Sequence, residues 1–285
     1  MLLYFLSSCM DNSKLPTAIM PPSGCNNNLF ICFDLVMPSI PGFVFSSAPK
    51  YPYGPRKIAS YYDKLMTQIL NYESYYAQGG DWGGAISTWL GYEHYKNCKG
   101  IHLNIMIVRD RNGPQDEAEK AWQKRFKNEQ SLEEGYRTMQ ATKPQTLAFA
   151  MTDNPIGVAA WILEKFHGWS DLRKKSLIEV YGYDDLITNL MLYILTNSFN
   201  TASWIYFGRR EEGCRVINFD GGKVEVPTAC ALYPKELLSW PPKSYVDRLF
   251  NVVQWNEFES GGHFAALEEP DTLIKDIRNF FKVIK

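Results

Sequence analysis

The 285-residue sequence lacks a long apolar run. A helix that crosses a bilayer needs about 18 or more such residues. The opening stretch Leu2-Leu3-Tyr4-Phe5-Leu6 is too short for the apolar part of a signal peptide and has no basic residues before it. We therefore expect no membrane span and no signal peptide, and we interpret residues 2–6 as a strand fragment of a cytoplasmic protein.

The sequence also lacks an excess of one charge and any closely spaced pair of cysteines. Its 30 basic and 31 acidic residues give a net charge of −1, so nothing in the composition indicates a nucleic-acid partner or an anionic membrane surface. The six cysteines lie far apart and form no CxxC pair: Cys9, Cys25, Cys32, Cys98, Cys214 and Cys230. This spacing predicts neither a zinc site nor a dense disulfide framework. We expect reduced thiols, no metal and no cofactor.

The most informative stretch is Gly79-Gly80-Asp81-Trp82-Gly83-Gly84. The aromatic run before it, residues 74–78, suits a strand, and residues 85–90 begin a helical pattern. Small residues around one side chain at a sharp strand-to-helix turn are typical of a nucleophile elbow, here with Asp81 in the place usually held by serine. An aspartate that only caps a helix on a glycine-rich turn is the commoner arrangement. The six residues alone leave both interpretations open.

Strand and helix patterns alternate around this turn. Residues 29–37 form a nearly continuous apolar run, typical of a strand buried on both faces of a parallel sheet. Residues 55–71 predict a helix that packs Ile58, Leu65, Ile69 and Leu70 inward, and residues 100–108 predict another buried strand. Two further strands are expected at 223–232 and 252–258, followed by a closing helix from Pro270. This order predicts an α/β protein with a mostly parallel, doubly wound sheet.

Residues 116–205 show several helical patterns and no convincing strand. One of them begins at Asp153-Asn154-Pro155, a cap followed by proline at the first helical position, and places Ile156, Ala159, Ala160, Leu163 and Phe166 on one face. A helical block inserted between the strands of an α/β sheet is a candidate lid over a site. We therefore expect three parts: the N-terminal part of the core at 1–110, a helical lid at 111–205, and the C-terminal part of the core at 206–285.

An acid after one late strand and a histidine after the next complete the chain order of an α/β-hydrolase triad. Glu236 and His263 occupy these places. Asp220 and Asp247 lie near enough in sequence to remain alternatives for the acid. The other histidines, at positions 94, 102 and 167, fall within expected helices or strands.

An aspartate at the elbow changes the chemistry, because a carboxylate needs no base to ionise it. Asp81 would attack a saturated carbon and displace either a halide or the oxygen of a strained epoxide. Water activated by His263, which Glu236 orients, would then hydrolyse the resulting ester.

Five motifs of the chain together resemble the microsomal-type epoxide hydrolases, including the juvenile hormone and fungal branches. They are PSIPGFVFS at 38–46, GGDWGG at 79–84, DNPIGVAAWILEKF at 153–166, VPTACALYPKELL at 226–238 and GGHFAALEEP at 261–270. The resemblance covers roughly residues 30–285. It implies an α/β-hydrolase fold with a helical lid that converts an epoxide to a vicinal diol with water. Asp81, Glu236 and His263 fall on the family's nucleophile, acid and general base.

The resemblance also implies two lid tyrosines that hydrogen-bond the epoxide oxygen, and their counterparts are Tyr136 and Tyr206. A phenol, with a pKa near ~10, stays protonated at neutral pH and can donate to a developing alkoxide. The backbone N–H of Trp82 is a natural oxyanion donor, although its indole could instead bind halide, as in the haloalkane dehalogenases. Apolar lid residues, Trp161, Trp169 and Trp204, suggest an apolar epoxide as the substrate, with water as the co-substrate.

The chain departs from the family pattern at its start. No HGxP motif, which supplies the second oxyanion donor in the family, is present, and Ser7-Ser8-Cys9-Met10 stand in its place. The chain therefore resembles an N-terminally shortened member with the first strands missing or degenerate. Loss of one donor typically costs about 10²- to 10³-fold in rate, so a slow enzyme is one expectation. A non-catalytic or poorly folding remnant and a truncated gene model are the others.

Overall fold

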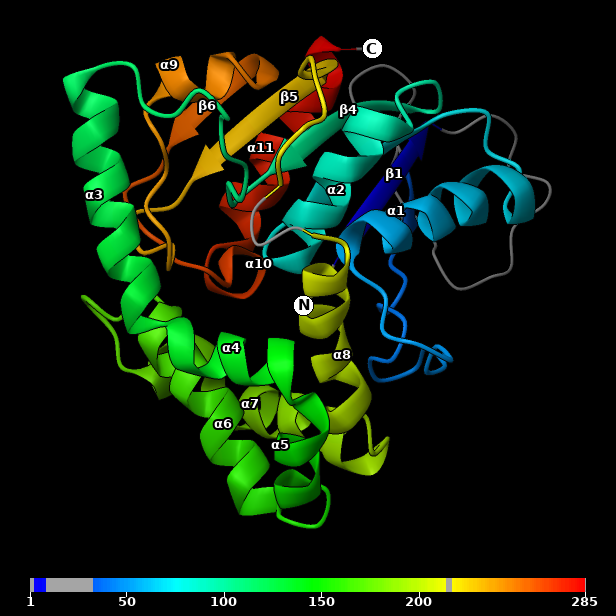
Figure 1. Ribbon diagram of the computed structural model, residues 1–285, viewed down its shortest axis with the longest axis vertical. Helices are drawn as coiled ribbons and strands as arrows, with labels where there is room; N and C mark the ends of the chain where they lie inside the picture. Colours follow the sequence, from blue (N-terminus) through cyan, green and yellow to red (C-terminus); the bar gives the residue numbers. More distant parts are fainter. Residues whose placement is uncertain (1–2, 9–32, 214–216, 285) are drawn as a thin grey trace.

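The computed structural model describes residues 3–8, 33–213 and 217–284. Six strands form one sheet in the order β2-β1-β3-β4-β5-β6 (Figure 1). The strands are β1 (Leu3–Ser8), β2 (Phe33–Val36), β3 (Tyr75–Gly79), β4 (Cys98–Leu103), β5 (Val224–Leu232) and β6 (Phe250–Glu257). Strands β3 to β6 pair in parallel, whereas β1 is antiparallel to both β2 and β3. The prediction of a mostly parallel α/β sheet is confirmed.

The prediction of a doubly buried strand at 29–37 is wrong for the part that the structure describes. Strand β2 has four residues and lies at the edge of the sheet, where only β1 pairs with it. The side chains of residues 34–36 are half-buried. The density of apolar residues in a run does not distinguish an edge strand from a central one, because that depends on pairing with distant segments.

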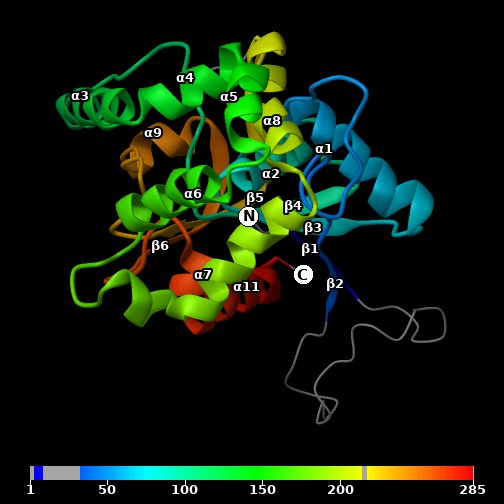
Figure 2. The ribbon, with the colours of Figure 1, turned by 90° about the horizontal axis from the view of Figure 1, so that it is seen from below.

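Helices cover both faces of the sheet (Figures 1 and 2). One face carries α1 (Pro55–Lys64), continued by the π-helical turn η1 (Leu65–Ile69), and α2 (Trp82–Glu93), and the other carries α11 (Pro270–Val283). The π-helical turn changes the predicted packing, because its wider turn shifts which side chains face the sheet. Met66 is fully buried there, whereas Ile69, expected to point inward, is 69% exposed.

Helix α2 is buried from Trp82 to Gly91. A helix that is apolar on all sides belongs in a core, and α2 packs against α1 and against strands β3, β4 and β5. The first turn of this helix, which follows Asp81, is therefore held by the buried core.

A block of helices lies beyond the carboxyl ends of the parallel strands (Figure 1). It consists of α3 (Glu117–Leu132), α4 (Glu134–Thr142), α5 (Pro144–Met151), α6 (Pro155–Trp169), α7 (Leu177–Leu195) and α8 (Phe199–Glu211). Helix α6 begins as the sequence predicts, because Asn154 Oδ1 accepts a hydrogen bond from Gly157 N at 2.9 Å. Helix α8 continues to Glu211, so the expected boundary at residue 205 falls inside a helix.

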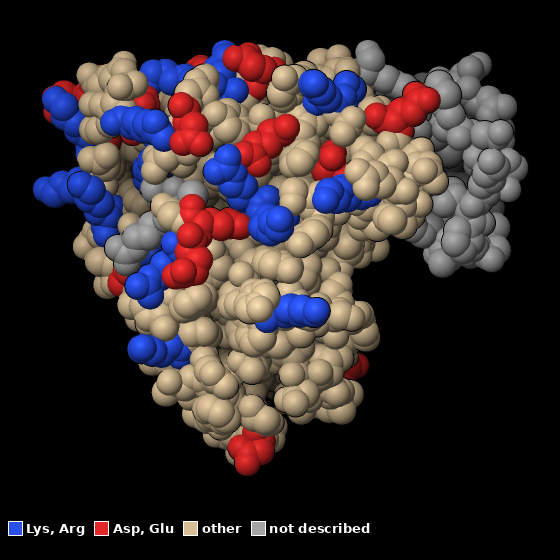
Figure 3. Space-filling view, turned by 45° about the vertical axis from the view of Figure 1, so that its right-hand side comes forward, with Lys and Arg blue, Asp and Glu red and all other residues tan. Residues whose placement is uncertain are grey.

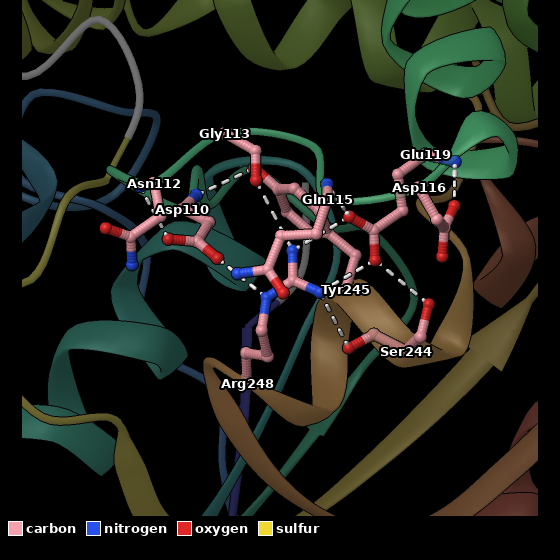
Figure 4. A network of polar contacts seen from close by, with 9 residues as sticks. All are labelled: Asp110, Asn112, Gly113, Gln115, Asp116, Glu119, Ser244, Tyr245 and Arg248. Atoms are coloured by element: carbon pink, nitrogen blue, oxygen red, sulfur yellow. Dashed lines mark hydrogen bonds and ion pairs between the residues drawn. The ribbon is translucent and has the colours of Figure 1, made fainter.

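A buried ion network anchors α3 to the core (Figure 4). The carboxylate of Glu119 is fully buried and accepts hydrogen bonds from Arg248 Nη1 at 2.7 Å and Nη2 at 2.9 Å, and from Ser244 Oγ at 3.0 Å. Arg248 Nε also donates to Asp110 Oδ2 at 2.8 Å. Ser244 belongs to the short helix α9 (Lys243–Asp247) and Arg248 follows it. The network thus fixes the start of the helical block against the C-terminal part of the sheet.

The surface shows charges of both signs. In Figure 3, basic and acidic side chains intermix over the upper part of one face, whereas the lower part, formed by the helical block, is largely uncharged. Within the described ranges, the helices are all too short or too polar to cross a bilayer.

Candidate active site

The turn between β3 and α2 is sharp and strained. Asp81 has φ 48° and ψ −126°, a conformation that residues with a side chain rarely adopt. The glycines around it have no room for a Cβ: one at Gly79 would lie 2.1 Å from the backbone of Gly83, and one at Gly84 would lie 2.6 Å from the side chain of Ile105. The side chain of Asp81 makes no capping hydrogen bond and is 37% exposed. The helix-cap interpretation of Asp81 is therefore wrong.

Glu236 and His263 meet beside this turn. The carboxylate Oε1 of Glu236 lies 2.7 Å from His263 Nδ1, and His263 Nε2 lies 3.8 Å from Asp81 Oδ2. The loops that carry the acid and the histidine are joined by backbone, since Lys235 N donates to Gly261 O at 3.1 Å. The structure thus brings together the three residues that the sequence selects for a triad, and it does so at the carboxyl ends of β3, β5 and β6.

The alternative acids lie elsewhere. Asp220 is 75% exposed and pairs with Arg111, and Asp247 pairs with Lys243. Neither has an interaction with His263 among the described residues. A second buried histidine–acid pair, His102 with Asp276 at 2.8 Å, lies between β4 and α11. This pair lines none of the cavities described below.

The charge state of His263 follows from its neighbours. Burial by itself lowers the pKa of His263, but the carboxylates of Glu236 and Asp81 outweigh that effect and raise the pKa to about 10. The imidazole is therefore protonated at neutral pH. At 3.8 Å, its contact with Asp81 is an ion pair rather than a hydrogen bond.

Two tyrosines of the helical block lie near Asp81. Tyr136 belongs to α4 and Tyr206 to α8, and their ring centroids are 5.9 Å apart. The ring of Tyr206 also packs edge-on against Trp82, at 4.7 Å. Burial is the main cause that raises the pKa of both phenols above the usual value. The nearby Tyr206 is the second cause for Tyr136, and the negative charge of Asp81 adds to the rise for both phenols. Both phenols are therefore protonated at neutral pH and able to donate.

Asp81, Trp82, Tyr136 and Tyr206 line one cavity of about 170 Å³. The rest of its wall is largely aromatic, with Phe43, Trp161, Phe166, Trp169, Tyr193, Phe199 and Phe264. The expected apolar lid residues Trp161 and Trp169 are thus at the cavity, whereas Trp204 is not part of its lining and donates from Nε1 to Asn200 instead.

Sequence reasoning missed Tyr193, a third tyrosine of this wall. Burial and then the charge of Asp81 raise the pKa of Tyr193 to about 12. Nothing in its local sequence separates it from the other tyrosines among the 17 in the chain. Its helical spacing in α7 is typical of an ordinary packed residue.

One of the two expected oxyanion donors, the backbone N–H of Trp82, lies beside Asp81 at the start of α2. Trp82 is the first residue of α2, so its backbone N–H has no partner within the helix. Residues 3–8 form β1 next to β3, which confirms the strand expected at the start of the chain. Cys9 and Met10, which stand in the place of the HGxP motif, lie outside the described residues.

The described residues also contain no group of histidine, cysteine and acidic side chains that could hold a metal ion.

Comparison with known proteins gives consistent matches. A family model for the alpha/beta hydrolase fold matches residues 22–152. Juvenile hormone epoxide hydrolase 1 of Ctenocephalides felis is 33% identical, with 95% of this chain and 62% of that protein covered. Epoxide hydrolase 1 of Sus scrofa is 32% identical, with 89% and 61% covered. The crystal structure of juvenile hormone epoxide hydrolase from Bombyx mori superimposes with a TM-score of 0.75 at 28% identity, with 88% of this chain and 65% of that chain covered. The chain thus spans less than two thirds of the length of these relatives.

Proposed function

We propose that this chain converts an apolar epoxide to a vicinal diol, because it is similar to the alpha/beta hydrolase family model over residues 22–152 and to the epoxide hydrolases compared above. The observation that carries the proposal is the common cavity of Asp81 and the phenols of Tyr136 and Tyr206. A nucleophile and proton donors on the wall of one cavity are what ring opening needs. Displacement of a halide, by contrast, needs no proton donor.

In the first step, a carboxylate oxygen of Asp81 attacks a ring carbon and the bond from that carbon to the ring oxygen breaks. The ring oxygen takes the proton of Tyr136 or Tyr206, which leaves a tyrosinate and an ester at Asp81. The aromatic cavity wall favours an apolar substrate and excludes water from the reacting atoms.

In the second step, water attacks the ester carbon of Asp81. The base must be neutral to accept the proton of this water, whereas His263 is protonated in the free protein. Formation of the ester removes one of the two negative charges that raise the pKa of His263. Transfer of the His263 proton to the tyrosinate then restores the phenol and leaves the imidazole neutral. Charge is conserved, because ester formation removes the negative charge of Asp81 and the proton transfer removes the positive charge of His263.

The water oxygen forms a bond to Cγ of Asp81, and the transient oxyanion can accept a hydrogen bond from the backbone N–H of Trp82. Cleavage of the ester bond then releases the diol, whose departing oxygen takes the second proton of the water, while His263 keeps the first and Asp81 is again a carboxylate. Glu236, at 2.7 Å from His263, orients the imidazole and stabilises its protonated form. One oxygen of Asp81 therefore comes from water after a turnover, and the diol receives its new oxygen from Asp81.

A single-turnover experiment in H₂¹⁸O tests this proposal with excess protein over an apolar epoxide such as styrene oxide. We expect an unlabelled diol, ¹⁸O in the peptide that contains Asp81, and no diol from Asp81→Ala. Asp220→Ala, an exposed acid outside the cavity, serves as the control and should retain turnover. Label in the diol would rule out the Asp81 ester. If well-folded protein forms neither ester nor diol, the chain is a non-catalytic relative.

A further inference from the structure

A second cavity, of about 90 Å³, lies against Asp81 and His263. Its other polar lining consists of Gln78, the fourth residue of β3, and Asn104, which follows β4. Residues 264–267 and Leu273 complete the wall with largely apolar atoms. This cavity has none of the lid tyrosines in its lining. A water molecule occupies about 30 Å³ in the liquid, so there is room for ordered water.

Two buried amides give this cavity hydrogen-bonding capacity. Gln78 is 1% and Asn104 is 4% exposed, and Gln78 Nε2 donates to Asn104 Oδ1 at 2.9 Å. That bond leaves Asn104 Nδ2 as a donor and Gln78 Oε1 as an acceptor. Neither atom has a protein partner within the described part of the chain. Neither is among the partnerless side-chain atoms that the protein shields completely from solvent. Both atoms therefore reach the cavity.

The glycine beside the nucleophile makes room for this arrangement. A Cβ at Gly80 would lie 2.4 Å from Asn104 Nδ2, so the amide packs directly on the backbone that precedes Asp81. Buried amide groups cost free energy unless they are hydrogen-bonded. A water molecule that accepted a hydrogen bond from Asn104 Nδ2 and donated one to Gln78 Oε1 would offset that cost.

We propose that this cavity holds the water consumed in ester hydrolysis and that Asn104 and Gln78 are positioning residues for it. The inference rests on the proposed function. A water molecule has two protons and two lone pairs. In the proposed geometry one proton points to His263 Nε2, the other to Gln78 Oε1, one lone pair accepts from Asn104 Nδ2, and the second attacks Cγ of Asp81. The lone pair that attacks Cγ therefore takes part in no hydrogen bond, whereas the other lone pair and both protons of the water do.

Rapid-quench kinetics with excess protein separate the two steps, because the protein–substrate ester is seen by intact mass. In Asn104→Leu and in Gln78→Met, we expect ester formation within about twofold of wild type and ester hydrolysis slower by about 10²-fold, the usual effect of a misplaced reacting group. The ester should accumulate in both variants. Asn251→Leu is the control, since this asparagine lies at the start of β6 and its Nδ2 donates to Glu225 O.

Asn104→Asp guards against misfolding as the explanation. It keeps the oxygen that accepts from Gln78 but loses the Nδ2 donor, so it should fold and still hydrolyse the ester slowly. Equal slowing of both steps would show a structural role and overturn the proposal, as would unchanged hydrolysis in the Asn104 and Gln78 variants. Absence of any ester in wild type would instead reject the proposed function, and this inference with it.

Discussion

The backbone carbonyl of Trp169 accepts a hydrogen bond from the backbone N–H of His263 at 2.9 Å. Trp169 is the last residue of α6, and its ring lies 5.1 Å from the imidazole of His263. Gly262, the residue before His263, permits this contact, because a Cβ there would lie 2.6 Å from the carbonyl oxygen of Trp169. The position of the histidine is therefore set by the helical block as well as by the sheet.

The first prediction concerns this contact. In Gly262→Ala, the new methyl group displaces either Trp169 or the loop that carries His263. We expect turnover of an epoxide to fall about 10²-fold, because a shift of about 1 Å in a reacting group has an effect of that size. Gly168→Ala is the matched control, since a Cβ there meets nothing within 4 Å, and it should retain wild-type kinetics. Equal rates for the two variants would contradict the steric argument.

The second prediction concerns the pKa of His263. A nuclear magnetic resonance titration should show imidazole protonation persisting to pH about 10 in wild type and a lower pKa in Glu236→Gln and in Asp81→Asn, because each variant removes a carboxylate that raises it. An unchanged pKa in both variants would contradict this cause.

The same raised pKa predicts how stability depends on pH. The folded-state pKa of about 10 exceeds the ordinary value of 6.5, so the contribution of His263 is fully present below pH 6.5 and is lost as the pH rises to about 10. Denaturant unfolding across this window should show a smaller loss of stability in Glu236→Gln than in wild type. A parallel decline in the two proteins would exclude this pair as the source.

The third prediction separates the roles of the tyrosines. Tyr136→Phe and Tyr206→Phe remove a hydroxyl with little change in shape, so we expect slower formation of the Asp81 ester by about 10- to 10³-fold, within the range of general-acid effects. Hydrolysis of an ester already formed should change less. Tyr183→Phe, at an exposed position of α7, should leave both steps unaltered. Rapid-quench measurements of the two steps make the comparison, and slower hydrolysis alone would assign the phenols a different role.

The fourth prediction concerns the ion network in Figure 4. Glu119→Gln removes the buried carboxylate that accepts from Arg248, while Asp110 still accepts from Arg248 Nε, so we expect a loss of about 1.5–3 kcal/mol of unfolding free energy, the usual value for hydrogen bonds to a charged group. Hydrogen bonds from Arg248, above all, lower the pKa of Glu119 from 4.5 to about 2. The stabilisation is therefore present above pH 4.5 and is lost as the pH falls towards 2.

Chemical denaturation of Glu119→Gln measures this effect. Glu117→Gln is the control, because its side chain is 90% exposed and pairs with Lys120. We expect a change within about 0.5 kcal/mol. Similar values for the two variants would show that burial of Glu119 adds nothing to the stability of the protein.

The sequence predicted the parts of the fold that depend on local patterns. The cap at Asn154, the strand at 223–232 and the closing helix from Pro270 are found because short-range chemistry determines them. Burial was less predictable. Ile156, expected on the inner face of its helix, is 80% exposed, since apolar spacing does not reveal what lies opposite.

The candidate site divides in the same way. Asp81, Glu236 and His263 could be selected because chain order and glycine-rich turns indicate their places, and Tyr136 and Tyr206 only through the family resemblance. Gln78 and Asn104 were not selected at all. Their pairing depends on the register of β3 against β4, which no local pattern encodes.

Strands β4 and β5 are parallel neighbours in the sheet, although residues 104–223 separate them in the chain. The whole helical block is thus one continuous insertion between two neighbouring strands. Replacing this insert with another would leave strand order and the elbow unchanged, but it would remove Tyr136, Tyr206 and the carbonyl of Trp169 that accepts from His263 N. Under the proposed function, this architecture lets the choice of compound change only through substitutions that keep these three positions, because the same insert shapes the cavity and supplies the proton donors.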